Sequence, residues 1–155
     1  MSRRAAIDAT MEDVLLTWHE MYAVGHGGLD IEHRRLLGII NRIHEAESRK
    51  DAAQQLLALS NSLYFAAMEH FRHENALMRD IIAGAYLSRI GCNNISEATV
   101  NEHCAEHASA LIELENMLHA FASSAEVSLA ARLRDWFVEH ATRHDSQLRA
   151  FFLPD

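Results

Sequence analysis

Apolar residues recur every three or four positions along four long stretches of the chain, a spacing typical of amphipathic α-helices. The predicted helices span residues 31–48, 51–82, 97–122 and 125–152. Asp30 precedes the first helix and Ser96 precedes the third, and both residue types are favoured as N-caps. Ser123 and Ser124 leave only a tight link before the fourth. Four such helices with mostly short links predict an all-α fold, an antiparallel up-down four-helix bundle.

A length of 155 residues fits a single domain, residues 1–155, in which the bundle occupies residues 31–152. Residues 1–30 are expected to form an N-terminal arm, because a cluster of glycines ends any helix just before the bundle. Trp18 and Tyr22 are large apolar residues within this arm. We therefore expect both side chains to pack back onto the bundle.

The least regular segment, residues 83–97, contains two glycines and two adjacent asparagines. It predicts an elongated connection between the second and third helices, which can extend both helices. An extension of this kind can build a surface for a second copy of the chain, cover a pocket or contact a protein partner. The sequence does not distinguish these three roles.

Composition and charge narrow the possible partners and location. A net charge of −8, with histidines neutral, argues against nucleic acid and against an anionic membrane surface, since both attract basic faces. No apolar run approaches the roughly 18 residues of a membrane span. The N-terminal residues lack the apolar stretch of a signal peptide, and two cysteines are too few for a disulfide scaffold. We therefore expect a cytoplasmic protein that binds neither nucleic acid nor membrane.

Every predicted helix carries at least one histidine on its apolar stripe, and two helices add an inward or near-inward carboxylate. The histidines are His33, His70, His103, His107 and His140, and the carboxylates are Glu74 and Asp145. A single buried histidine is usually a hydrogen-bonded core residue. Five of them would each need separate partners, because an unpaired buried polar group is costly. A shared metal site satisfies all of them together.

The number of candidate ligands narrows the choice of metal. Five imidazoles and two carboxylates are too many for one tetrahedral zinc ion. Imidazole is a good ligand for iron, zinc and copper, and carboxylates can bridge two ions. Two iron ions bridged by two carboxylates fit this set best.

Helix periodicity alone does not select Asp145 as a ligand. His144 lies four residues after His140 and shares its helix face, whereas Asp145 lies about 140° around the axis. A bridge between two cations favours a carboxylate, and a π-bulge or a bend in the helix would turn Asp145 inward. Spacing alone would select His144, whereas the bridging chemistry favours Asp145, with such a local distortion.

The same residues form four motifs, in order, that resemble those of the hemerythrin family, specifically its bacterial members. The motifs are Trp18, Gly25 and Asp30 leading to His33; His70-Phe71-x-x-Glu74 followed by Leu77-Met78; His103-x-x-x-His107; and Trp136-x-x-x-His140-x-x-x-x-Asp145. The family pattern that these residues resemble selects Asp145, which we therefore predict as the ligand. The match covers most of the chain. It departs from the family between Glu74 and His103, where 28 residues replace a much shorter connection.

The resemblance implies a role for each residue. One iron ion would be held by His103, His107 and His140, the other by His33 and His70, with Glu74, Asp145 and an oxo or hydroxo group as bridges. The two-histidine iron would keep one open position, where dioxygen would bind as a hydroperoxide. The residues implied in walling the dioxygen pocket are Trp136, Phe137 and Phe71.

The leading prediction is therefore a dioxygen-binding di-iron protein, not an enzyme, that serves oxygen storage, delivery or sensing. One alternative is a di-iron enzyme that reduces nitric oxide, scavenges peroxide or repairs damaged iron centres. Against it, di-iron oxygenation sites in ferritin-like bundles use more carboxylates and fewer histidines. The other alternative is a redox or oxygen-sensing module that signals through a partner. A reversible oxygen adduct would favour the first prediction, and steady turnover with an electron donor the second.

Overall fold

The computed structural model describes residues 16–85, 95–123 and 128–153, and every regular element in these ranges is helical. In chain order the elements are the 3₁₀ turn η1 (Glu20–Tyr22), α2 (Gly27–Glu47), α3 (Ala53–Ile82), α4 (Glu97–Ser123), α5 (Leu129–Glu139), the π-helical turn η3 (His140–His144) and α6 (Ser146–Phe152). None of the described helices combines the length and hydropathy needed to cross a membrane. The all-α prediction is confirmed for this part of the chain.

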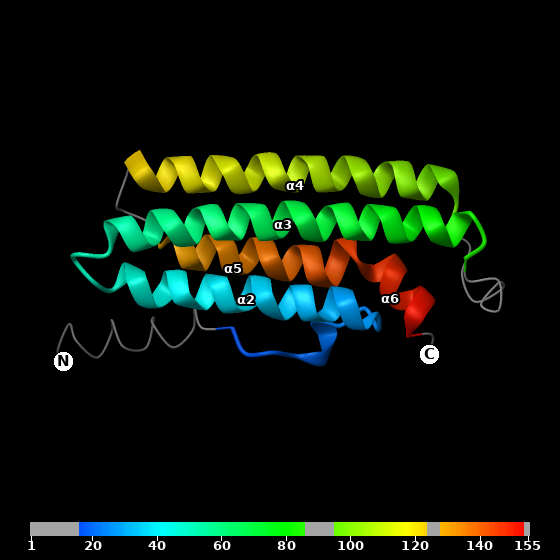
Figure 1. Ribbon diagram of the computed structural model, residues 1–155, viewed down its shortest axis with the longest axis horizontal. Helices are drawn as coiled ribbons and strands as arrows, with labels where there is room; N and C mark the ends of the chain where they lie inside the picture. Colours follow the sequence, from blue (N-terminus) through cyan, green and yellow to red (C-terminus); the bar gives the residue numbers. More distant parts are fainter. Residues whose placement is uncertain (1–15, 86–94, 124–127, 154–155) are drawn as a thin grey trace.

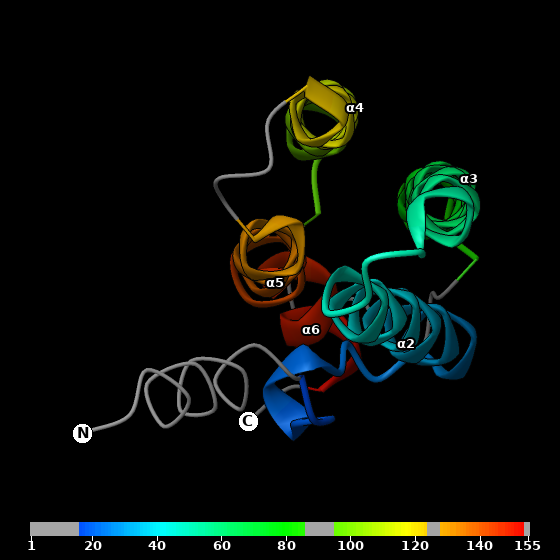
Figure 2. The same cartoon turned by 90° about the vertical axis from the view of Figure 1, so that its left-hand side faces the viewer.

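Helices α2, α3, α4 and α5 lie side by side with their long axes nearly parallel (Figure 1). Helix α3 packs against α2 and α4, and α5 packs against the same two helices. The four helices therefore close into a ring around one interior, which Figure 2 shows end-on. The predicted four-helix bundle is confirmed.

Three predicted features fall partly or wholly outside the described residues. They are the first half of the N-terminal arm, residues 1–15; most of the 83–97 connection, residues 86–94; and the start of the fourth predicted helix with part of its link, residues 124–127. At the start of α5, Ser128 is the N-cap and accepts a hydrogen bond from the Ala131 N–H at 3.2 Å. Ser96 likewise caps α4 through the Thr99 N–H, at 3.1 Å, as the sequence predicts.

The predicted N-cap role of Asp30 is wrong. Helix α2 begins one turn earlier, and His26 is its N-cap, accepting from the Leu29 N–H at 3.4 Å. The Asp30 carboxylate instead accepts hydrogen bonds from the N–H groups of Val24, at 2.7 Å, and Gly25, at 3.2 Å. Asp30 therefore holds the turn of the arm against the first helix turn.

The N-terminal arm packs onto the bundle as predicted. Tyr22 is buried with its ring edge-on to Phe137, 5.3 Å between centroids, and Trp18 packs against the same core. Gly25 has a φ of +84°, and a Cβ at this position would lie 2.5 Å from Leu153 Cγ. This left-handed conformation and close approach both favour glycine.

The fourth predicted helix is interrupted by the π-helical turn. The Asp145 N–H donates to the His140 carbonyl at 3.2 Å, which is the i→i+5 bond of a π-turn. Helix α6 follows directly and leaves the line of α5 (Figure 1). The turn therefore inserts one extra residue between the faces of α5 and α6.

Two apolar clusters occupy the bundle interior, and a polar layer separates them along every helix. The larger cluster includes Leu36, Leu63, Leu114 and Leu133. The smaller one contains Val24, Leu29, Leu77, Met78, Val100 and Leu148. In α3, for example, Leu63 and Leu77 lie on opposite sides of the buried His70 and Glu74. The ends of α3 and α4 beyond the polar layer thus form a second, smaller core.

Candidate metal centre

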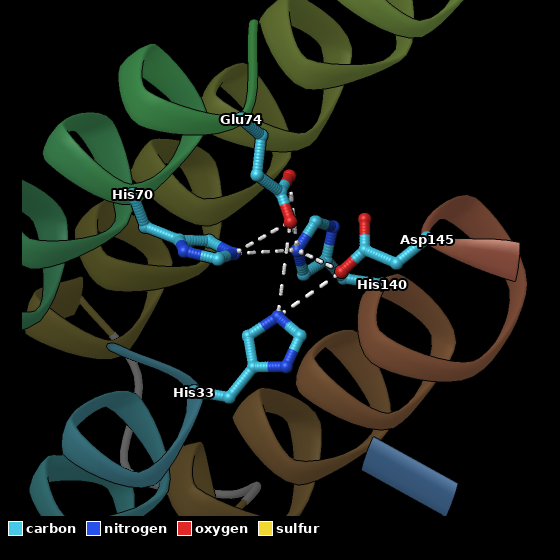
Figure 3. Close-up of side chains that lie close together, drawn as sticks. All are labelled: His33, His70, Glu74, His140 and Asp145. Atoms are coloured by element: carbon cyan, nitrogen blue, oxygen red, sulfur yellow. Dashed lines mark hydrogen bonds and ion pairs between the residues drawn. The ribbon is translucent and has the colours of Figure 1, made fainter. Parts of the chain in front are cut away.

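Seven polar side chains from all four sides of the bundle meet in the layer between the two apolar clusters. They are His33 from α2, His70 and Glu74 from α3, His103 and His107 from α4, and His140 and Asp145 from the α5–α6 region. Each is at most 2% exposed. We call these seven residues the ligand cluster; Figure 3 shows five of them pointing toward one another. The structure thus brings together every residue predicted as a metal ligand.

The Glu74 carboxylate lies at the centre of the cluster, and its two oxygens face different histidines. Oε1 is 3.1 Å from His70 Nε2 and 3.9 Å from His33 Nε2. Oε2 is 2.8 Å from His107 Nε2 and 3.7 Å from the Nε2 atoms of both His103 and His140. Glu74 therefore separates the five imidazoles into a pair and a triplet.

Asp145 forms the second contact between the two sides of the cluster. Its Oδ2 is 3.0 Å from His33 Nε2 and 3.1 Å from His140 Nε2, and its Oδ1 is 3.8 Å from His103 Nε2. The π-turn produces this arrangement, since the extra residue turns Asp145 inward in place of His144. His144 lies beside the cluster, its ring edge-on to His140 at 6.2 Å.

Three of the five imidazoles are oriented by hydrogen bonds through their outer nitrogen. His33 Nδ1 donates to the Tyr22 carbonyl at 2.6 Å. His70 Nδ1 contacts Glu32 Oε2 at 2.9 Å, and His107 Nδ1 contacts Asn75 Oδ1 at 2.7 Å. A proton on Nδ1 leaves the Nε2 lone pair directed into the cluster, as metal-binding histidines require.

Sequence reasoning missed these three outer partners. Glu32 also accepts a hydrogen bond from Nδ1 of the half-exposed His73. Glu32 and Asn75 are each next to a predicted ligand in the sequence, and this proximity is the one feature of the sequence that could have indicated them. Neither lies on an apolar stripe, however, so periodicity does not select them.

Without a bound ion, the carboxylates and imidazoles of the cluster shift one another's pKa values. Burial opposes protonation of His70, but the carboxylates of Glu74 and Glu32 outweigh it and raise the His70 pKa to about 10. Burial likewise opposes ionisation of Glu74, but the imidazoles of His70 and His140 hold its pKa well below the usual value. Burial lowers the pKa of His140. Without a bound ion, the ionised carboxylates are thus balanced by a protonated His70, whereas His140 is neutral; a bound cation would take the place of the His70 proton.

Hydrogen bonds within the described residues do not satisfy the inward-facing atoms. Both oxygens of Glu74 and of Asp145, and Nε2 of His33, His103 and His107, are buried without a hydrogen-bond partner there. The candidate ligand atoms fall into two groups, each with members within 4.8 Å of one another, and both groups include Glu74 and Asp145. Donors at about 2.0–2.3 Å from one ion lie roughly 3–4.5 Å apart. The cluster therefore fits bound cations, with two carboxylates shared between two positions.

A comparison with protein-family models identifies the domain. Residues 25–151 match the model described as the hemerythrin HHE cation-binding domain. The chain belongs to the hemerythrin family. Comparisons with curated proteins and with solved structures gave no match. The bundle is therefore a hemerythrin fold, and the buried ligand cluster is the candidate for its cation-binding site.

The three aromatic residues implied in the dioxygen pocket surround the hemerythrin cluster. Phe71 stacks on His107 with 4.2 Å between ring centroids, and Phe137 lies edge-on to His33 at 5.9 Å. Trp136 is parallel to the His140 ring and donates its Nε1–H to a main-chain carbonyl in α4. All three side chains are buried. They exclude water from one side of the cluster, while their contact with dioxygen stays a prediction.

The assignment of His140 to one ion also stays a prediction. Through Glu74 Oε2, His140 lies with His103 and His107, as the resemblance implies. Through Asp145 Oδ2 it lies with His33, and its Nε2 is 3.1 Å from His70 Nε2. Among ligand atoms within 4.8 Å of one another, His140 groups with His33 and His70, and not with His103 and His107 as the resemblance implies.

Proposed function

We propose that this hemerythrin-family protein holds two iron ions in the ligand cluster and binds dioxygen reversibly, without turnover, for oxygen storage, delivery or sensing. The observation that carries the proposal is the sharing of Glu74 and Asp145 between two groups of ligand atoms. A carboxylate facing two positions acts as a bridge, and imidazole is a preferred ligand of iron.

By resemblance to the family, the histidines would divide unevenly between the two ions, with His140 assigned by the family pattern and not by its position, which is with His33 and His70. His33 and His70 would serve one ion, and His103, His107 and His140 the other. The ion with fewer histidines would have a position free for a small neutral ligand. Two ferrous ions would supply the two electrons that reversible dioxygen binding needs.

The surroundings of the cluster favour binding over turnover. Phe71, Trp136 and Phe137 are buried against the histidine rings. On the ring faces that they cover, these aromatic side chains keep water away from the ions and supply no carboxylate or imidazole to deliver protons. The cluster has only two carboxylates, fewer than the di-iron oxygenation sites of ferritin-like bundles.

The test is anaerobic reconstitution with Fe²⁺, metal analysis and optical titration with dioxygen. We expect two iron ions per chain and an oxygen-dependent absorption band that disappears when oxygen is removed. A His70→Ala variant should lose the band, whereas His19→Ala, outside the cluster, should retain it. One zinc ion per chain, or sustained oxygen consumption with an electron donor in place of a stable adduct, would contradict the proposal.

A further inference from the structure

Two neighbouring grooves open on the protein surface next to the ligand cluster, between α4 and the π-turn. The larger has a volume of about 410 Å³ and the smaller about 220 Å³. Glu102, Glu106 and His144 line both of them. We call the two together the acidic groove.

The walls of the acidic groove carry mainly negative charge. Besides Glu102 and Glu106, the larger part is lined by Glu113 and Glu139. The one basic side chain that lines the groove within the described residues, Arg143, forms an ion pair with Glu139 at 3.1 Å. An excess of carboxylates in a concave surface concentrates cations there and repels anions.

The floor of the acidic groove is made by histidines of the ligand cluster. His140 lines the larger part and His103 the smaller, and both are at least 98% buried. Nδ1 of His140 and Nε2 of His103 have no hydrogen-bond partner among the described residues. The same is true of the buried Nδ1 of His144, which lines both parts of the groove and whose ring lies 6.2 Å from that of His140. Imidazole nitrogens without a hydrogen-bond partner among the described residues therefore lie both at the groove and in the ligand cluster.

We propose that the acidic groove is the route by which divalent metal ions reach the ligand cluster, with His144 as a transient ligand on the way. The carboxylates attract the hydrated cation, the His144 imidazole exchanges for one of its waters, and the ion then passes to the histidines of the floor. This inference rests on the proposed metal site but not on its reaction with dioxygen.

The chemistry of the groove favours a cation over other small ligands. A neutral molecule such as dioxygen gains nothing from carboxylates, and an anion is repelled by them. On the opposite side of the cluster, His33 is covered by the Tyr22 carbonyl of the arm and by Phe137 of α5. The outer nitrogen of His70 is already bonded to Glu32. The α4 side therefore offers cations the more accessible imidazoles.

The experiment measures the rate of metal uptake by the metal-free protein. Co²⁺ is mixed with the full chain in a stopped-flow instrument, its absorption is followed, and the final metal content is determined separately. A Glu102→Gln/Glu113→Gln variant removes two groove charges. A Glu45→Gln/Glu115→Gln variant makes the same change of net charge at exposed positions outside the groove.

We expect the groove variant to take up Co²⁺ on the order of tenfold more slowly at low salt, with the difference shrinking as salt is added. The control variant should match the unmodified protein. A His144→Ala variant should also be slower, but independently of salt, because direct coordination is not screened. All variants should reach the same final metal content.

Four results would overturn the proposal. Equal rates in the groove and control variants would show that the groove carboxylates do not guide the metal. An unchanged or faster rate for His144→Ala would exclude this imidazole as a transient ligand, and a lower final content would make it a permanent one. Failure of the unmodified chain to bind Co²⁺ or Fe²⁺ would contradict the metal site itself, whereas loss of only the oxygen response would leave the route intact.

Discussion

The two sides of the ligand cluster contain the same kinds of ligand but differ in what surrounds them. His33 and His70 are held by a main-chain carbonyl and by the Glu32 carboxylate, and the arm covers His33. On the α4 side, His107 has a neutral amide partner, and His103 Nδ1 is 4.0 Å from a Glu106 oxygen. The first side is tightly held with an anionic partner, and the second borders the acidic groove.

This difference indicates that the two sides of the ligand cluster have different roles. A carboxylate bonded to a ligand histidine makes that imidazole a stronger donor and fixes its orientation. The open groove on the other side offers a path for exchange. The contacts around the ligands, more than the ligands themselves, therefore distinguish the two sides.

Removing the residue that both sides share should have the largest effect. We expect Glu74→Gln to lose at least one of two metal ions per chain, because both oxygens of Glu74 face ligand histidines. Metal analysis after reconstitution and desalting measures this. Glu69→Gln on the same helix removes a half-exposed carboxylate and should keep the full content. Full occupancy in Glu74→Gln would show that the two sides bind metal independently.

Asp145 and His144 offer the next test, because the π-turn selects one of two adjacent residues. Asp145→Asn should lose about one ion per chain, since its two oxygens contact imidazoles on both sides. His144→Ala should retain both ions, because its ring lies beside the cluster. Loss of an ion in His144→Ala, with full metal content in Asp145→Asn, would mean that His144 is the ligand, as helix periodicity alone favours.

The outer partners should have smaller effects that differ between the two sides. We expect Glu32→Gln to weaken metal binding by about tenfold, because His70 loses a charged partner. Asn75→Ala should weaken it by only about threefold, because the bond to His107 is neutral. Competition with a chelator of known affinity measures both. Equal losses would remove the proposed difference between the sides.

The arm should affect stability while leaving the cluster nearly unchanged. Gly25→Ala should lower the free energy of unfolding by about 1–3 kcal/mol, since Gly25 has a positive φ and lies against Leu153. Gly27→Ala should change it by less than about 1 kcal/mol, because no atom lies within 4 Å of the added Cβ. Urea denaturation of the metal-free protein compares them. A similar cost for both would show that the turn at Gly25 is not strained by a side chain.

Sequence reasoning worked where structure is determined by local periodicity. A helix repeats every 3.6 residues, so the stripes that carry His33, His70 and His107 could be predicted to face one interior. The N-cap prediction for Asp30 was wrong because it considered only the helix that follows this residue. A cap preference is also local, but the carboxylate bonds instead to main-chain groups of the arm turn that precedes the helix.

The sequence by itself determined the four-helix fold and the set of inward polar residues, because both follow from the order of side chains along each helix. Only the tertiary structure decided which atoms meet. The position of Asp145 depends on one i→i+5 bond, and Glu32 reaches His70 across 38 residues of chain. The acidic groove likewise exists only where α4 packs beside the π-turn. The bond from His70 to Glu32 and the walls of the groove join residues far apart in sequence, and no periodic pattern along the chain encodes them. The π-turn is local, but helix periodicity alone favours His144, so its prediction needed the bridging chemistry and the family motif.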